Sequence, residues 1–214
     1  SGIGTTCLHH FGYTPEVKIE RDKVKRNLKL LEMAMDEQPA EPAMLMNYAL
    51  DLFNDGQLEA ALEKDQEAFA MLSKHTREDV LPEVRERLVS VYCYHLLQAE
   101  LYEELVEIAT SPLAIDCGPT ASIEYVHGLA LLKLERFEEA IEPFRKCIAK
   151  RDEPAFTARF KGVEGHGPHH LLADCLAKTG QEETATAEYE QALEMAPEAT
   201  SVRHGYAHYL TELE

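Results

Sequence analysis

Apolar residues recur at intervals of three and four along most of the chain, which is the spacing of one face of an α-helix. Leu28, Leu31 and Met35 follow this spacing, and Leu45 and Leu52 continue it. The alternating runs of Val, Ile and Thr that are typical of strands do not occur. Glycines and prolines punctuate the pattern at intervals that suit short helices joined by turns. The pattern therefore predicts an all-α fold.

The clearest unit is residues 166–197, which read as a helix, a glycine turn, a second helix and a proline. Small residues at the predicted helix contacts would let the two helices approach closely, and bulky ones would fill the gaps. Glycine would supply a left-handed turn between the helices. The positions concerned are Leu172, Ala173, Leu176, Gly180, Ala185, Tyr189, Ala192 and Pro197. This unit resembles the 34-residue tetratricopeptide repeat (TPR).

The same template fits three earlier segments and one incomplete copy at the end of the chain. The copies start at Pro42, Glu86, Ala121, His166 and Thr200, so the intervals by subtraction are 44, 35, 45 and 34 residues. The two long intervals predict extra residues near 73–81 and 152–165. We expect residues 21–214 to form one domain: a leading helix over 21–37 that covers the first copy, repeats near 42–75, 80–110, 119–152 and 166–199, and a terminal helix over 200–214.

The TPR resemblance implies a right-handed superhelix of about ten helices whose first helices line a concave surface. The repeat register assigns to this surface Met46, Leu50, Phe53, Arg87, Ser90, Tyr94, Gln98, Tyr125, Leu129, Lys133, His170, Asp174, Lys178, His204 and His208. We predict a groove for an extended or helical peptide, with Tyr94 and Tyr125 as anchors. The alternative is that several of these side chains pack against the neighbouring repeat. TPR domains that grip chaperone C-termini clamp a carboxylate with Lys and Asn, and these positions do not offer that pair.

One proline and several histidines stand out within the repeats. Pro143 lies inside the second helix of the third copy, so we expect it to kink that helix or delay its start. His166, His169 and His170 cluster in sequence, while His204 and His208 are spaced to share a helix face. Zinc is conceivable, with Asp174 as a further ligand, but neither group has an evident third ligand. Surface or groove histidines are the favoured interpretation, and we expect no metal.

No arrangement typical of a catalytic site is visible. The sequence lacks a glycine-rich phosphate loop after a strand, a His-Glu-x-x-His motif and a nucleophile elbow. We therefore expect no catalytic residue and no cofactor in this chain.

The charge excludes some partners. Lys and Arg number 21 against 39 Asp and Glu, for a formal net charge of −18. Such an excess repels phosphate backbones and anionic lipids, so we expect no nucleic-acid partner. No apolar stretch approaches the roughly 18 residues of a membrane-spanning helix. Most acidic residues fall on outer and second-helix faces, so the charge describes a solvated exterior and argues little for a basic ligand.

The five cysteines are widely spaced, and no Cys-x-x-Cys occurs among them. This usage differs from a disulfide framework or a structural zinc site. It predicts reduced thiols in the cytoplasm.

Residues 8–39 do not begin like a repeat. His10, Gly12 and Tyr13, followed by Lys23–Leu31 (KVKRNLKLL), resemble the junction between the catalytic domain and the C-terminal TPRs of bacterial family 2 glycosyltransferases. The resemblance implies that residues 1–20 are a tail left from such a junction. It also implies a parent protein that transfers sugar, where His10 alone could face the nucleotide-sugar. The Asp-x-Asp metal motif of that domain is absent from the sequence, so this chain is not expected to transfer sugar itself.

Three functions remain open. The leading one is a non-catalytic TPR scaffold that binds a protein or peptide and forms part of a larger glycosyltransferase-like protein. The second is the acceptor-binding region of a family 2 glycosyltransferase, which requires an upstream Asp-x-Asp domain. The third is a self-association module that makes a homo-oligomer through Tyr206, Tyr209 and Leu210 of the terminal helix.

Overall fold

The structure is a computed structural model that describes residues 16–75, 79–155, 160 and 162–212. These residues form eleven α-helices and no strand, which confirms the all-α prediction. The helices are α1 (Glu16–Glu37), α2 (Pro42–Asn54), α3 (Leu58–Leu72), α4 (Pro82–Gln98), α5 (Tyr102–Ala109), α6 (Pro112–Cys117), α7 (Ala121–Lys133), α8 (Phe137–Lys150), α9 (Gly167–Lys178), α10 (Glu182–Met195) and α11 (Thr200–Glu212).

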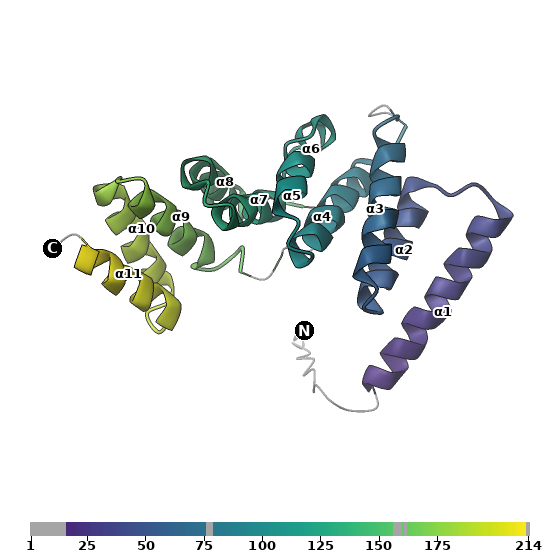
Figure 1. The fold of residues 1–214 in the computed structure, drawn as a ribbon, viewed down its shortest axis with the longest axis horizontal. Coiled ribbons are helices and arrows are strands. Elements are labelled where there is room, and N and C mark those ends of the chain that lie inside the picture. Colours follow the sequence, from purple (N-terminus) through teal and green to yellow (C-terminus); the bar gives the residue numbers. More distant parts are fainter. Residues whose placement is uncertain (1–15, 76–78, 156–159, 161, 213–214) are drawn as a thin grey trace, which may run out of the picture.

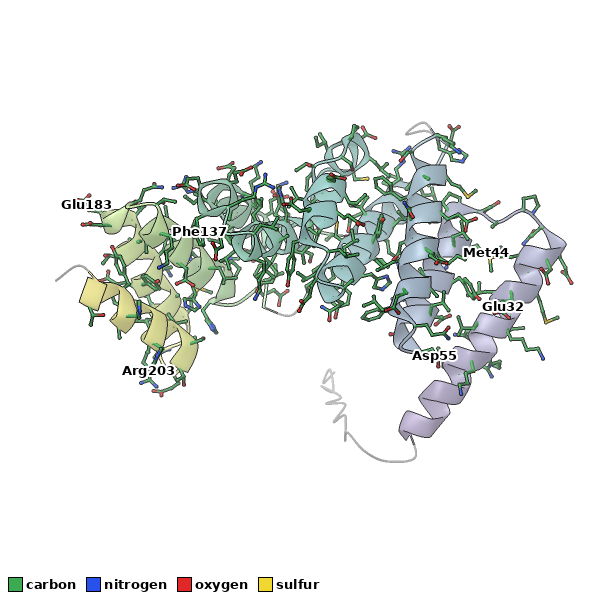
Figure 2. The ribbon with its side chains drawn as sticks, in the orientation of Figure 1. Glu32, Met44, Asp55, Phe137, Glu183 and Arg203 are labelled. Atoms are coloured by element: carbon green, nitrogen blue, oxygen red, sulfur yellow. The ribbon has the colours of Figure 1, made fainter. Side chains whose placement is uncertain are left out.

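The helices stack as pairs along the long axis of the molecule, with α1 at one end and α11 at the other (Figure 1). The pairs are α2–α3, α4–α5, α7–α8 and α9–α10, and each pair contacts mainly the pairs beside it. A chain of nearest-neighbour contacts of this kind is a solenoid. Charged side chains such as Glu183 and Arg203 project outward at the C-terminal end (Figure 2). None of the helices in the described part is long and apolar enough to cross a membrane.

Each pair turns at the same register through a residue with left-handed backbone. Gly56 and Gly180 have φ of 84° and 73°, and Glu100 and Glu135 take the same conformation with φ of 58° and 57°. The residue after each of them donates its N–H to the carbonyl five residues back, for example from Leu101 to Leu96 at 3.0 Å. This bond closes the helix end in the manner of a Schellman motif. All four turns are therefore alike, although only two of them carry glycine.

Small buried residues allow the helices to approach closely, as the sequence predicts. A Cβ atom added to Gly128 of α7 would lie only 2.8–2.9 Å from three ring atoms of Phe144 in α8. The fully buried large side chains on either side include Leu88, Leu131 and Leu172. The core between the paired helices is thus built from small and bulky residues, and within the described residues it falls into four clusters along the solenoid.

The structure differs from the sequence prediction at three places. The short helix α6 is additional, begun by the Ser111 hydroxyl, which accepts a hydrogen bond from the Ala114 N–H at 3.2 Å. Helix α1 begins at Glu16 rather than Arg21. Of the two expectations for Pro143, the delayed start is wrong, because α8 begins at Phe137, in register with the other second helices, while the kink stays a prediction. The turn before Phe137 sets that start, and the proline removes only one later helical hydrogen bond.

Helix α1 packs on α2, as expected for a helix that covers the first repeat. Leu28 is buried in a cluster with Ala49 and Leu52 of α2. The Tyr48 hydroxyl donates a hydrogen bond to Glu32 Oε1 at 2.7 Å. The residues of the family 2 glycosyltransferase resemblance that precede α1, including His10, lie outside the described residues.

Candidate peptide-binding groove

The predicted concave positions differ widely in exposure. Met46 and Ser90 are each 2% exposed, so both are core residues and the groove assignment is wrong for them. Their helix face turns toward the neighbouring pair, where Met46 packs within a core cluster. The half-buried positions are Leu50, Phe53, Tyr94, Tyr125, Leu129, His170 and Asp174, and the exposed ones are Arg87, Gln98, Lys133, Lys178, His204 and His208. The remaining positions fall into a central part and a C-terminal part of the concave face.

Aromatic rings fill the central part. Phe53 of α2 meets Tyr94 of α4 edge-on, with ring centroids 5.7 Å apart. Tyr94 also meets Phe160, from the connection between α8 and α9, at 5.2 Å. Tyr125 of α7 is half-buried and packs, like Phe160, against a cluster that contains Val163. Tyr94, one of the two predicted anchors, is therefore already in contact with the chain's own Phe160, which the repeat register could not reveal.

A buried polar pair lies beneath this aromatic cluster. Asp65 Oδ2 of α3 lies 2.5 Å from His95 Nδ1 of α4, and both side chains are completely buried. Phe53 stacks on the His95 ring, with centroids 4.4 Å apart. Burial raises the pKa of Asp65, and the hydrogen bond with His95 opposes this rise. Nothing in the repeat pattern signals this pair, apart from an aspartate at a position that is usually aromatic.

The C-terminal part of the concave face holds an open pocket of about 420 Å³. Its floor is apolar and aromatic, and its rim carries two histidines, a lysine and a carboxylate. The lining residues are Leu132, Phe137, Asp174, Ala177, Lys178, Tyr189, His204, Gly205, His208 and Tyr209. They come from α7, α8, α9, α10 and α11. Asp174, Lys178, His204 and His208, which the sequence placed in the groove, thus line one pocket.

The close approach of α11 to α9 shapes this pocket. A Cβ atom on Gly205 would lie 2.8 Å from His170 Nε2 and 3.6 Å from Asp174 Oδ1. The Tyr189 hydroxyl donates a hydrogen bond to Asp174 Oδ1 at 2.6 Å, and His170 Nε2 lies 3.7 Å from the other carboxylate oxygen. The Asp174 carboxylate is therefore fixed in place by its own neighbours.

Aromatic packing at α11 changes the expected self-association surface. Tyr206 stacks on Tyr189 with centroids 5.1 Å apart. Tyr209 is only 4% exposed, and its hydroxyl donates a hydrogen bond to the Glu182 carbonyl at 3.0 Å. Of the three side chains predicted for that surface, Leu210 alone is exposed, at 43%. The predicted apolar surface is therefore smaller than the sequence suggested.

The histidines do not converge on a metal site. His169 Nδ1 lies 2.7 Å from Glu188 Oε2, so this ring contacts a carboxylate of α10. His204 and His208 line the pocket rim. In the described ranges, no group of three or more His, Cys, Asp or Glu side chains is placed to hold a metal ion.

The comparisons with known proteins concern the repeats. Residues 123–149 and 167–198 match the family model described as tetratricopeptide repeat. These segments are the α7–α8 and α9–α10 pairs, so the TPR prediction is confirmed for them. A search of curated proteins gives no significant match.

Solved TPR structures share the fold over most of the chain. YrrB, described as a TPR protein with an unusual peptide-binding site, is 16% identical with a TM-score of 0.65, over 85% of this chain and 82% of its own. A mutant form of MamA is 17% identical with a TM-score of 0.62, over 82% of this chain and 90% of its own. A thermophilic TPR protein of Thermus thermophilus is 19% identical with a TM-score of 0.51, over 92% and 96%.

Proposed function

We propose that this chain is a non-catalytic TPR scaffold that binds a protein or peptide in its concave groove. The observation that carries the proposal is the pocket of about 420 Å³ among α7–α11, whose lining includes four residues that the repeat register assigns to the concave face. Ligand sites in proteins are typically concave and apolar, with a few polar groups that fix orientation. The likeness in fold to YrrB, whose description names a peptide-binding site, supports the same role.

The lining suggests how a peptide would be held. Leu132, Phe137 and Tyr189 offer a floor for one apolar side chain of the ligand. Lys178 and the two rim histidines offer donors toward peptide carbonyls or a carboxylate. Asp174 is already engaged by the Tyr189 hydroxyl, so it shapes the pocket more than it contacts the ligand.

Binding at this pocket can be tested with peptides selected on the intact chain from a random displayed library. Ala177→Phe would fill the pocket, because Ala177 lines it from α9 and is only half-buried. We expect this variant to bind the selected peptides at least about tenfold more weakly. Ala187→Phe, on the exposed face of α10, is the matched control and should bind as the wild type does. Equal affinity of both variants for the peptides would contradict the proposal.

A second candidate is the acceptor-binding region of a family 2 glycosyltransferase. Its support is the sequence resemblance around His10 and Lys23–Leu31, and the latter segment forms the middle of α1. An upstream catalytic domain with an Asp-x-Asp motif in the full gene would favour this candidate. A full gene without such a domain would eliminate it.

Self-association is the third candidate. Light scattering of the purified chain tests it, because a monomeric mass at high concentration would argue against it.

We also propose a reducing, cytoplasmic location. Burial raises the pKa of Cys93, Cys147 and Cys175 to about 12, so these thiols suit core packing better than redox chemistry.

A further inference from the structure

The middle of the concave face is occupied by a residue of the chain itself. Phe160 reaches it from the connection between α8 and α9, and its ring lies 5.2 Å from Tyr94. The backbone N–H of Phe160 donates a hydrogen bond to the Ser122 hydroxyl at 3.2 Å. Ser122 is only 2% exposed, so its hydroxyl is a buried acceptor for a backbone N–H at this place.

The residues around Phe160 come from the first helices of two successive pairs. Tyr94 comes from α4, whereas Ser122 and Tyr125 come from α7. One residue thus receives an aromatic contact and a backbone hydrogen bond from neighbouring repeats. This combination of a side-chain subsite and a main-chain contact is how grooves read extended peptides.

Two residues that follow Phe160, Gly162 and Val163, position the backbone beside α7. Gly162 has φ of 99°, and a Cβ on it would lie 3.4 Å from the Tyr125 hydroxyl. Val163 is completely buried in a cluster with Ala121 and Cys147. Val163 therefore anchors the segment at the ends of α7 and α8, while Phe160 makes the groove contact.

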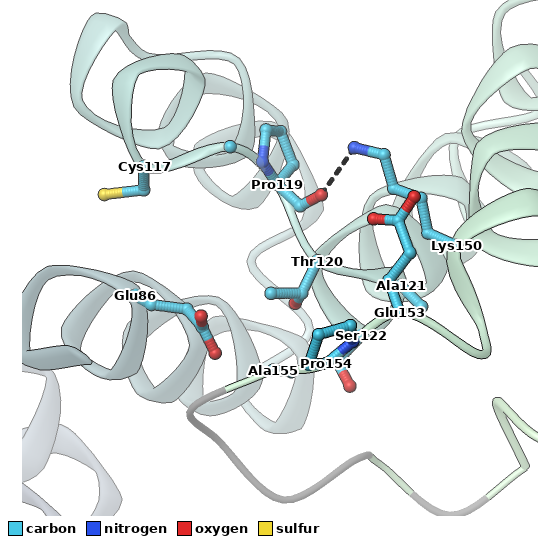
Figure 3. Close-up of a pocket in the computed structure, with 11 residues that line it drawn as sticks. Glu86, Cys117, Pro119, Thr120, Ala121, Ser122, Lys150, Glu153, Pro154 and Ala155 are labelled. Carbon is cyan, nitrogen blue, oxygen red and sulfur yellow. Dashed lines mark hydrogen bonds between the residues drawn. The ribbon is translucent and has the colours of Figure 1, made fainter. Parts of the chain in front are cut away.

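The space beside this segment is only partly filled. A pocket of about 270 Å³ lies there, lined by Glu86, Ala121, Ser122, Lys150 and Pro154 among others (Figure 3). The Lys150 ammonium donates a hydrogen bond to the Pro119 carbonyl at 2.7 Å at its rim. Ser122 faces both this pocket and Phe160, so a longer peptide segment has room along the same helices.

We propose that Phe160 occupies a ligand subsite of the groove from within the same chain. The subsite takes an aromatic side chain from an extended peptide segment whose own N–H reaches the Ser122 hydroxyl. This inference rests on the proposed peptide-binding role and adds to it the class of side chain at the centre of the groove. Because Phe160 is tethered, its effective concentration at the subsite is high, and it weakens binding of any competing peptide.

A peptide copy of the segment tests this directly. The probe is a fluorescein-labelled peptide with the sequence of residues 154–166 (PAFTARFKGVEGH), and binding is measured by fluorescence anisotropy. The receptors are the wild-type chain and its Phe160→Ala variant. We expect the variant to bind the probe at least about tenfold more tightly than the wild type, since the aromatic contact with Tyr94 becomes available and the segment without its ring is more easily displaced from the Ser122 hydroxyl. The same peptide carrying Phe160→Ala should lose this gain, and so should a receptor that also carries Ser122→Ala.

Circular dichroism and thermal melting establish that the receptors are folded. If Phe160→Ala does not fold, Phe160→Leu keeps an apolar side chain in place while removing the ring, and a smaller gain in probe affinity in the same direction is expected. A folded variant that binds the probe no better than the wild type would overturn the proposal. A probe whose binding is abolished by Ala177→Phe would also overturn it, because the probe would then sit in the C-terminal pocket. The proposed peptide-binding role would stand even if the Phe160 proposal failed, provided that library-selected peptides still bind Ala177→Phe more weakly than the wild type.

Discussion

Asp65 and His95 meet at the same register of the solenoid where Tyr189 and Tyr209 pack ring against ring. Asp65 and Tyr189 stand at position 24 of their repeats, and His95 and Tyr209 stand at position 10 of the repeats that follow. The aromatic pair has centroids 5.5 Å apart. The polar pair instead forms a contact of 2.5 Å in the same kind of buried interface. Among the residues that the structure describes, one oxygen of Asp65 and the Nε2 atom of His95 are buried there without a hydrogen-bond partner.

The polar pair in place of an aromatic pair leads to a stability prediction. His95→Phe alone should lower the free energy of unfolding by about 3–5 kcal/mol, because it leaves the Asp65 carboxylate buried without its partner. Asp65→Leu combined with His95→Phe should restore the free energy of unfolding to the wild-type value or above it. Urea unfolding of the single and double variants measures both effects. A double variant as unstable as His95→Phe alone would refute this explanation.

The half-buried His127 predicts a pH dependence. Burial, with smaller contributions from Lys146 and Arg136, lowers its pKa from 6.5 to about 4. The unfolded chain then binds a proton more readily than the folded chain, so stability falls as the pH falls below about 6.5 and continues to fall toward about 4. The loss from this group should be about 3 kcal/mol. His127→Phe should flatten that part of the profile, and a titration of His127 by NMR that gives an ordinary pKa would contradict the prediction.

The two glutamates with left-handed backbone offer a way to stabilise the fold. Glu100 and Glu135 occupy the turn position that Gly56 and Gly180 occupy in the other pairs. A side chain in this conformation costs about 1 kcal/mol relative to glycine. We expect Glu100→Gly and Glu135→Gly each to raise the free energy of unfolding by about that amount. Thermal melting checks this, with Gly180→Ala as the opposite control, and a loss of stability in both glutamate variants would refute it.

Gly128 tests how closely α7 and α8 pack. Replacing a glycine inside a helix with alanine normally stabilises the helix by up to about 1 kcal/mol. At Gly128 the new Cβ would meet the Phe144 ring at 2.8–2.9 Å, so Gly128→Ala should instead destabilise the protein by about 1–3 kcal/mol. Gly165→Ala meets no atom within 4 Å and serves as the control. A melting temperature raised by Gly128→Ala would show that the helices tolerate a wider separation.

The sequence pattern predicted the helix pairs well because each pair repeats the same small and bulky positions. It missed α6, since six residues are too few to show a helical period. It placed Met46 in the groove, because register alone cannot tell a side chain that faces a ligand from one that faces the next helix. The Asp65–His95 contact joins two helices, so no local pattern signals it.

The pocket at the C-terminal end was predicted only as a set of positions, and its role as a groove stays a prediction. Asp174, Lys178, His204 and His208 came from the repeat register, and the structure brings them to one pocket. Phe160 was missed because the long connection that carries it has no periodicity from which its path could be derived. The length of that connection was the available signal, since an insertion between repeats has to cross some surface of the solenoid.

Peptide binding at the C-terminal pocket is what most needs to be measured. The most direct measurement maps a library-selected peptide onto the protein by NMR chemical-shift changes. If the peptide binds there, the largest changes fall on Ala177, Tyr189 and Tyr209, which line that pocket. Changes confined to exposed residues of α3 and α10, outside the pocket, would contradict it.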